Sequence, residues 1–277
     1  MTDMPPSVAP APQKRDPIVR PVTVNDIAEA IGAGLRDLQA TPLLSLGFGA
    51  LYALGGLAIL FSVTALGMPY LAYPLAAGFA IMGPFVAVGL YEISRRREQG
   101  LPVTPGGLWR KVRSRSEVGW MAFVTLFVFI IWMYQVRLLM ALFLGFNASF
   151  ATLPQFINVV LTTQEGLLFL ALGNVIGAVL SVILFSLTVV SFPLLLDRDV
   201  DFITAMITSV RAVVTSPGPL VAWALVIVML LIVSALPAFL GLIFTLPVLG
   251  HATWHLYRRI VAPEEQPAAS EEAGAVT

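Results

Sequence analysis

The chain has 277 residues, of which 58% are hydrophobic and only 12% are charged, with equal numbers of acidic and basic side chains. Together with a mean hydropathy of +0.88, this composition excludes a soluble globular protein and indicates a membrane protein with several spans. The chain has no cysteine, which excludes disulfides and thiol chemistry.

The two ends of the chain differ from its centre in composition. Residues 1–21 are rich in proline and small side chains and contain no apolar core followed by a cleavage site, so we expect a disordered cytoplasmic tail and no signal peptide. Residues 262–277 are acidic and lack aromatic side chains, which predicts a second disordered cytoplasmic tail. Residues 22–261 are expected to form one all-α transmembrane domain.

Five hydrophobic runs are long enough for a hydrocarbon core of about 30 Å, which takes roughly 20 helical residues. They are residues 43–66, 71–91, 118–144, 166–192 and 220–257. The last run is about twice the length of one span and contains Pro237, so we predict a tight hairpin of two helices there. The prediction is six spans, with longer charged connections at residues 92–117 and 194–217.

The basic residues predict the orientation of these spans. Fifteen of the sixteen Lys and Arg residues fall on one side of the six spans. Because basic residues are retained on the cytoplasmic side, both termini and both charged connections are predicted to be cytoplasmic. The exception is Arg137 in the third span. We weigh two interpretations of it, a guanidinium that reaches the outer headgroups or nearby carbonyls and a buried counter-charge for a substrate or for Glu165.

The stretch from Phe192 to Pro219 predicts a short amphipathic helix at the membrane surface. Its apolar residues recur at i, i+4, i+8 and i+11, which places them on one side of a helix. They are Phe202, Met206, Val210 and Val213. Asp199 is expected to be the N-cap, and Pro217 is expected to end the helix.

A similar segment occurs 175 residues earlier in the chain. Four residues of the two segments are identical in the alignment: Asp26 with Asp201, Ala30 with Ala205, Arg36 with Arg211, and Pro42 with Pro217. A third, weaker copy begins at Thr104. These similarities predict three repeats, each an amphipathic helix followed by a transmembrane hairpin.

Two histidines form an H-x-x-x-H pair in the sixth predicted span. His251 and His255 have the spacing that two metal or haem ligands need. With no third histidine and no cysteine the site is incomplete, and we favour interfacial histidines beside Trp254. The internal alignment places Glu92 of the second span at the position of His255, which predicts a contact between these two side chains.

An acidic triplet precedes the amphipathic helix. Asp197, Asp199 and Asp201 have the chemistry of a divalent-cation site, but helix capping and an ion pair with Arg198 or Arg211 account for them with fewer assumptions. The basic connection at residues 92–117 has the composition of a segment that binds anionic headgroups. Its simpler meaning is a topology signal.

Three segments carry a resemblance to a known family, namely FPLLLDRDVDFITAMITSVRAV, SPGPL and LPVLGHATWHLYRR. They resemble an uncharacterised family of bacterial, mostly proteobacterial, integral membrane proteins, some of which are labelled cytochrome c oxidase subunit I. That subunit needs more histidines for its haems and copper than the two present here. The arrangement Pro-Leu-x-x-Asp before a helix is also similar to membrane domains attached to some glycerophosphodiester phosphodiesterases. The resemblance implies an inner-membrane location and a six-helix fold, and no reaction.

The sequence contains no nucleotide-binding glycine loop, nucleophile motif or catalytic carboxylate pair, so we expect no enzyme, catalytic residue, metal or cofactor. We favour a non-enzymatic inner-membrane protein that accompanies or helps assemble a larger membrane complex. Its expected partners are the lipid bilayer and another inner-membrane complex or a second copy of itself, with no nucleic acid. The alternatives are a permease for a small solute, suggested by proline kinks and repetition, and a haem- or metal-binding protein. The polar candidate positions are Glu92, Arg137, Asp197, Asp199, Asp201 and Arg211.

Overall fold

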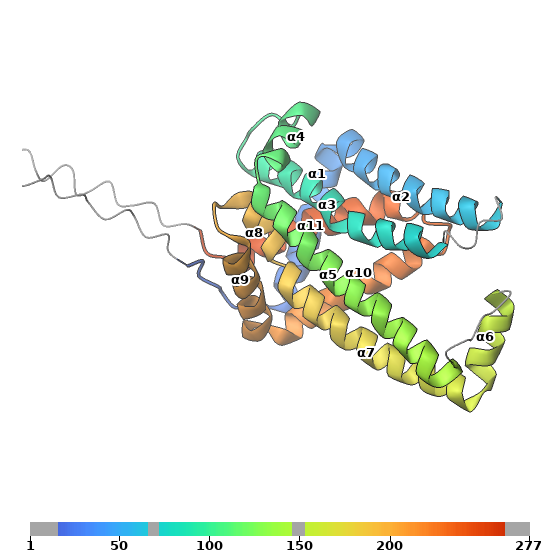
Figure 1. Ribbon diagram of the computed structural model, residues 1–277. Helices are drawn as coiled ribbons and strands as arrows, with labels where there is room; N and C mark the ends of the chain where they lie inside the picture. The colour runs from blue at the N-terminus through green and yellow to red at the C-terminus, as the bar shows by residue number, and fades with distance from the viewer. Residues whose placement is uncertain (1–15, 66–71, 146–152, 264–277) are drawn as a thin grey trace, which may run out of the picture.

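The computed structural model describes residues 16–65, 72–145 and 153–263 (Figure 1). Within these residues the chain is helical, and a single β-bridge pairs Val19 with Val261. In chain order the helices are α1 (Val24–Ala40), α2 (Pro42–Thr64), α3 (Ala72–Glu98), α4 (Pro105–Arg113), α5 (Ser116–Leu139) with the π-helical turn η2 (Met140–Leu144), α6 (Leu153–Thr162), α7 (Gln164–Thr188), α8 (Ser191–Asp197), α9 (Phe202–Thr215), α10 (Pro217–Ala235) and α11 (Leu242–Ile260). The predicted all-α class is confirmed.

Among the described residues, four helical stretches are long and apolar enough to cross a membrane. They cover Pro42–Ser62, Ser116–Leu144, Gln164–Asp197 and Pro217–Ala235, which are the first, third, fourth and fifth predicted spans. The second and sixth predicted spans lie in α3 and α11. Both of these helices end in arginines, and α11 also contains two histidines. The count of six spans therefore stays a prediction.

The long helices form pairs, and a shorter helix precedes each pair. α1 precedes α2 and α3, α4 precedes α5 and α7, and α9 precedes α10 and α11. In Figure 1 the α5/α7 pair runs away from the α2/α3 pair and carries α6 at its far end. The last turns of α3 and α11 meet α8 at the opposite end, where α3 also packs against α4. We call this end the charged end.

The junctions before α2 and α10 have nearly the same backbone conformation. Thr41 has φ −130° and ψ 52°, and Ser216 has φ −135° and ψ 62°. Each is followed by a proline at the start of the next helix, where a missing N–H costs nothing. The two junctions are separated by 216 − 41 = 175 residues, the offset that aligns the two segments. This similarity is local, and the repeat of three units stays a prediction.

The start of α9 differs from the expectation. Its N-cap is Asp201, whose carboxylate accepts a hydrogen bond from the Thr204 N–H at 2.9 Å. The expected cap, Asp199, lies two residues before this position and its side chain is 80% exposed. The N-cap prediction was therefore wrong, because the helix begins at Phe202, the first residue of the apolar stripe, and the residue directly before it is Asp201.

The buried face of α9 also differs from the apolar stripe in the sequence. Its buried residues are the small side chains Ala205, Thr208, Ser209 and Ala212. Small side chains let helices approach closely, and here α9 packs against α7 and α8. The larger residues of the predicted stripe lie at the margin of this contact, and Val210 is exposed. Apolar residues also cover the outer side, which sequence spacing alone does not distinguish from the packed side.

Helix α11 is buried along most of its length and packs against α1, α2 and α3. The contact with α1 depends on Gly34, because a Cβ atom there would lie 2.7 Å from the backbone nitrogen of Ala252. The chain before α1 also follows the end of α11, since the Arg20 N–H donates to the Ile260 carbonyl at 2.7 Å. Residues 16–21, which the sequence placed in a tail, thus run beside α11.

Candidate functional site

A buried histidine joins three helices near the charged end. His251 of α11 is fully buried, and its Nε2 lies 2.9 Å from the Ser45 hydroxyl of α2. Its Nδ1 lies 2.7 Å from the Ser94 hydroxyl of α3. Both ring nitrogens are therefore occupied by hydrogen bonds between helices, which satisfies a polar group that would otherwise be costly to bury.

The second histidine lies one turn further along α11 and has an acidic partner. Nε2 of His255 is 2.8 Å from Oδ2 of Asp37 in α1. Arg97 of α3 reaches the same carboxylate at 3.4 Å. Burial raises the pKa of Asp37, but hydrogen bonds from His255 and Ser94 outweigh burial and hold this pKa below its usual range. Asp37 therefore connects α1 to α3 and α11.

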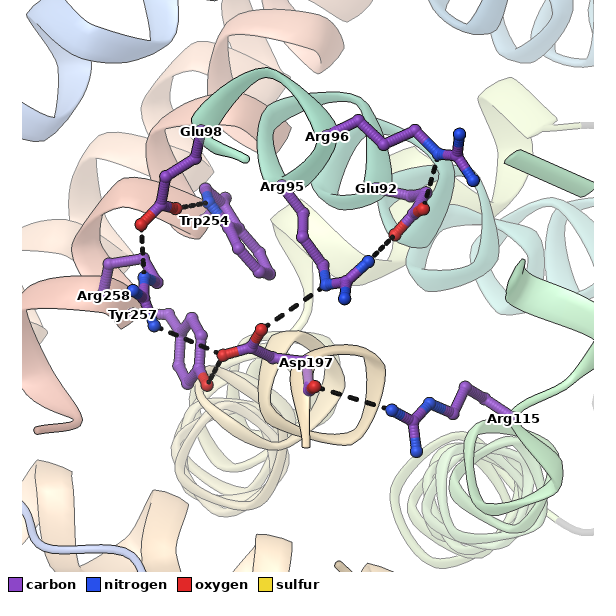
Figure 2. Close-up of polar contacts among 9 residues, drawn as sticks. All are labelled: Glu92, Arg95, Arg96, Glu98, Arg115, Asp197, Trp254, Tyr257 and Arg258. Atoms are coloured by element: carbon purple, nitrogen blue, oxygen red, sulfur yellow. Dashed lines mark hydrogen bonds and ion pairs between the residues drawn. The ribbon is translucent and has the colours of Figure 1, made fainter. Parts of the chain in front are cut away.

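Asp197, at the end of α8, is the centre of a second network (Figure 2). Its Oδ2 accepts a hydrogen bond from the Tyr257 hydroxyl at 2.7 Å and lies 3.3 Å from Nη1 of Arg258. Its Oδ1 lies 3.5 Å from Nε of Arg95. Nη2 of Arg115 approaches the Asp197 carbonyl oxygen at 3.5 Å. One carboxylate thus links α8 to α3 and α11, and its backbone faces the start of α5.

Glu92 lies beside this network and is fully buried. Its carboxylate receives Nη1 of Arg95 at 3.3 Å and Nε of Arg96 at 2.7 Å (Figure 2). Arg96 also donates to the Pro102 and Gly107 carbonyls, at 3.0 Å each. This ion pair therefore orders the loop between α3 and α4, since buried charges require such partners.

The predicted contact between His255 and Glu92 does not form, because the structure gives each side chain another partner. His255 pairs with Asp37, and Glu92 pairs with the two arginines that follow it on α3. The internal alignment compared equivalent positions in two helices. Equivalent positions in two repeats do not have to touch each other.

The other candidate positions lie apart. Asp199 is 3.7 Å from Nη1 of Arg115, and Asp201 caps α9. Arg211 is exposed and lies 3.5 Å from Asp16. Arg137 is exposed, and among the described residues no acidic side chain lies within ion-pair distance of it, Glu165 included. The three aspartates of the acidic triplet therefore have different partners. The described residues contain no group of acidic or histidine side chains that could hold a metal ion.

The histidine pair does not fit a haem or metal site. Each such ligand must present a free ring nitrogen to the metal. Both nitrogens of His251 are bonded to serine hydroxyls, and the Nε2 of His255 is bonded to a carboxylate. The two side chains connect helices in this arrangement.

Asp37, Ser45 and Ser94 were not predicted from the sequence. Asp37 stands three residues after Gly34 and seven after Ala30, on the buried side of α1. A carboxylate on the packed face of an amphipathic helix is the signal that could have identified it. The two serines carry no comparable signal, because isolated serines are common inside apolar helices.

A groove lies between α5 and α7, away from both networks. It has a volume of about 530 Å³, and its lining includes Trp132, Gln135, Gly173, Asn174, Gly177 and Ser181. Both side-chain polar atoms of Gln135 are buried, and neither has a hydrogen-bond partner among the described residues. Such a group is expensive to leave unpaired. An amide without a partner among the described residues is therefore buried at the wall of the groove, within the apolar part of the chain.

The chain is similar to one family of known sequences. The family model DUF2189, described as a predicted integral membrane protein, matches residues 72–197, from the start of α3 to the end of α8. No curated protein and no solved structure matches the chain. The bacterial source and the cytochrome label that the sequence resemblance implied do not follow from this match. Together with the four apolar helices, the match shows that this chain is an integral membrane protein similar to DUF2189.

Proposed function

We propose that the protein is a non-enzymatic component of a bacterial inner membrane, and that its α5/α7 pair binds a helix of another membrane protein. The observation that carries the proposal is the Gln135 amide, whose polar atoms are buried in the α5/α7 groove without a partner among the described residues. A polar side chain inside a membrane stabilises helix association when the partner supplies a hydrogen bond. A partner helix with a polar side chain would complete this site.

The surroundings of Gln135 support the same conclusion. Only about 6% of the residues in the most apolar part of α5 and of α7 are buried, so the two helices pack sparsely against the rest of the described chain. Gly173 and Gly177 line the groove one helical turn apart. Small residues at this spacing allow two helices to approach closely. The groove thus combines open space and close approach with a buried amide that lacks a hydrogen-bond partner in the part of the chain that the structure describes.

The positions of the charges support the orientation that we assign. The arginines of α3, α4 and α11 gather at the charged end. If this end is cytoplasmic, as basic residues favour, α3 and α11 complete six spans and both termini are cytoplasmic. The networks around Asp37 and Asp197 then act as connectors that hold the three helix pairs together at the cytoplasmic surface.

Co-purification from native membranes tests the proposal. A tagged chain should recover one membrane protein in near-stoichiometric amount, and Gly173→Leu with Gly177→Leu should reduce that recovery at least tenfold. Cβ atoms at these glycines would find their nearest neighbours at 3.7 and 4.0 Å, so the change fills the groove without a backbone clash. Val175→Leu is the matched control, because Val175 is exposed on α7 outside the groove lining. Equal recovery with all three forms contradicts the proposal.

A small solute is the second candidate occupant of the same groove. Its volume of about 530 Å³ falls within the usual range for small-molecule sites, and amide and hydroxyl groups lie beside aromatic rings. This observation favours the permease alternative. A chain recovered alone, whose melting temperature rises with a polar amphiphile in the native form but not in the leucine variant, would support the solute and exclude the partner helix.

A further inference from the structure

A second groove lies between α2, α3 and α4, close to the charged end. Its volume is about 340 Å³, and it is lined almost wholly by apolar side chains. The lining includes Leu43, Phe48 and Leu51 of α2, Phe85 of α3, and Leu108 and Trp109 of α4. Gly47 forms part of the wall, and a Cβ atom there would meet nothing within 4 Å. The groove is therefore apolar and open at Gly47.

The residues at its mouth are typical of a membrane interface. Trp109 is 68% exposed and Leu43 is 87% exposed, although both side chains are large and apolar. Tryptophan is enriched where hydrocarbon meets the headgroups. Helix α4 is amphipathic and carries Arg110, Lys111 and Arg113 in its last turn. It therefore has the character of a helix lying at this boundary.

The basic side chains of α4 differ from those of the adjoining segments. Arg96, Arg97 and Arg115 each have an acidic partner within 4 Å. Arg110 and Arg113 are exposed, and among the described residues neither has an acidic side chain within ion-pair distance. Arg113 is four residues after Trp109, so it lies one turn further along nearly the same side of α4. A positive charge that has no acidic partner in the described part of the chain thus stands one turn from Trp109 of the groove lining.

We infer that this groove is a binding site for an anionic phospholipid. One acyl chain lies along Leu51 and Phe85 and passes Gly47, and the phosphate group meets Arg113 and Arg110 at the mouth. The charge complementarity between the unpaired guanidinium groups and a phosphate favours an anionic headgroup over a zwitterionic one. The apolar wall favours a lipid over a free anion.

Native mass spectrometry of the delipidated protein tests this site with phosphatidylglycerol and phosphatidylcholine. Arg110→Gln with Arg113→Gln should weaken phosphatidylglycerol binding about 25-fold, because each arginine near the surface contributes about fivefold. Arg211→Gln is the control, since Arg211 is also exposed on a short helix but has Asp16 as a partner. We expect that control to bind both lipids as the native chain does.

The variant Gly47→Leu tests the acyl chain separately. It should weaken the binding of both lipids, because the leucine side chain would enter the groove, where a Cβ atom at this position meets nothing within 4 Å. Equal binding of the two lipids by the native chain, or the same loss with Arg211→Gln as with the α4 variant, overturns the inference. Competition by inorganic phosphate that is unaffected by Gly47→Leu also overturns it, because the site would then recognise an anion alone. The arginine variants alter exposed positions, so this part of the test does not depend on repacking.

Discussion

Asp197 and Tyr257 are joined by a hydrogen bond of 2.7 Å between the tyrosine hydroxyl and the carboxylate, although they are 60 residues apart in the chain. Asp197 ends α8, and Tyr257 lies in the last turns of α11. The same carboxylate also meets Arg95 and Arg258 (Figure 2). The α8 helix that continues the long α7 is therefore tied to α11 and to the end of α3.

Replacing Asp197 with Asn should lower stability by about 2 kcal/mol, because two arginines would lose a partly buried counter-charge while the tyrosine keeps an acceptor. The Asp197 side chain is only 13% exposed, so water compensates little. The melting temperature in detergent should fall by about 5 °C. Asp199→Asn serves as the control and should change it by about 1 °C or less, because that side chain is 80% exposed. Equal falls in melting temperature for the two variants would contradict the central role of Asp197 in the network.

The contact between α1 and α11 can be tested with two glycines of the same helix. Gly34→Ala should destabilise the protein by about 1 to 3 kcal/mol, because its Cβ would lie 2.7 Å from the Ala252 nitrogen. Gly32→Ala should stabilise it by about 0.5 to 1 kcal/mol, because its Cβ has space and alanine favours helix. Thermal melts of both variants measure the difference. Two shifts of the same sign would contradict the observed packing.

The hydrogen bonds of His251 should contribute to stability through both serines. His251→Ala is expected to cost about 2 to 4 kcal/mol, because it removes a buried side chain together with its hydrogen bonds to the Ser45 and Ser94 hydroxyls. Ser94→Ala alone should cost about 1 kcal/mol. Denaturation of the two variants in mixed micelles gives both values. A variant at His251 as stable as the native chain would show that this connection is dispensable.

Acid should weaken the start of α9. Hydrogen bonds from the Thr204 side chain and backbone lower the pKa of Asp201 below its ordinary 3.8. A carboxylate whose pKa is lower in the folded state stabilises the fold above about pH 4 and loses that contribution as the pH falls through its folded pKa. Asp201→Asn keeps a good N-cap but cannot titrate. Between pH 6 and pH 2.5 the melting temperature of this variant should therefore fall less steeply than that of the native chain. An equal fall in both proteins would contradict the role of Asp201 as a titrating cap.

The all-α class and four of the apolar spans could be predicted because runs of about twenty apolar residues are rare outside helices that cross a membrane. The packed face of α9 could not be predicted, because its large apolar residues lie at the margin of the contact and on the exposed side, while its buried side carries small residues. Tertiary packing decided between them through the small residues Ala205 and Ala212. The helical periodicity of the apolar residues alone does not show which side of α9 is packed.

The candidate site was predictable only in part. Asp197 was identified as a member of the acidic triplet and Glu92 by the internal alignment, and the structure places both in the networks at the charged end. Their partners come from distant helices, and no local pattern connects positions so far apart in sequence. Gln135 was missed because a single glutamine in an apolar span resembles a tolerated polar residue until its surroundings show that it lacks a partner among the described residues.

Cysteine crosslinking in native membranes tests the α5/α7 groove most directly. The chain has no cysteine of its own, so Gly177→Cys introduces one thiol into the groove and Val175→Cys introduces one on the exposed surface of α7. A short thiol-to-amine or photoactivatable crosslinker should join Gly177→Cys to one membrane protein as a product of discrete mass. Val175→Cys should give at least tenfold less of that product. The same products from both variants, or crosslinks to lipid alone, would contradict a partner helix in this groove.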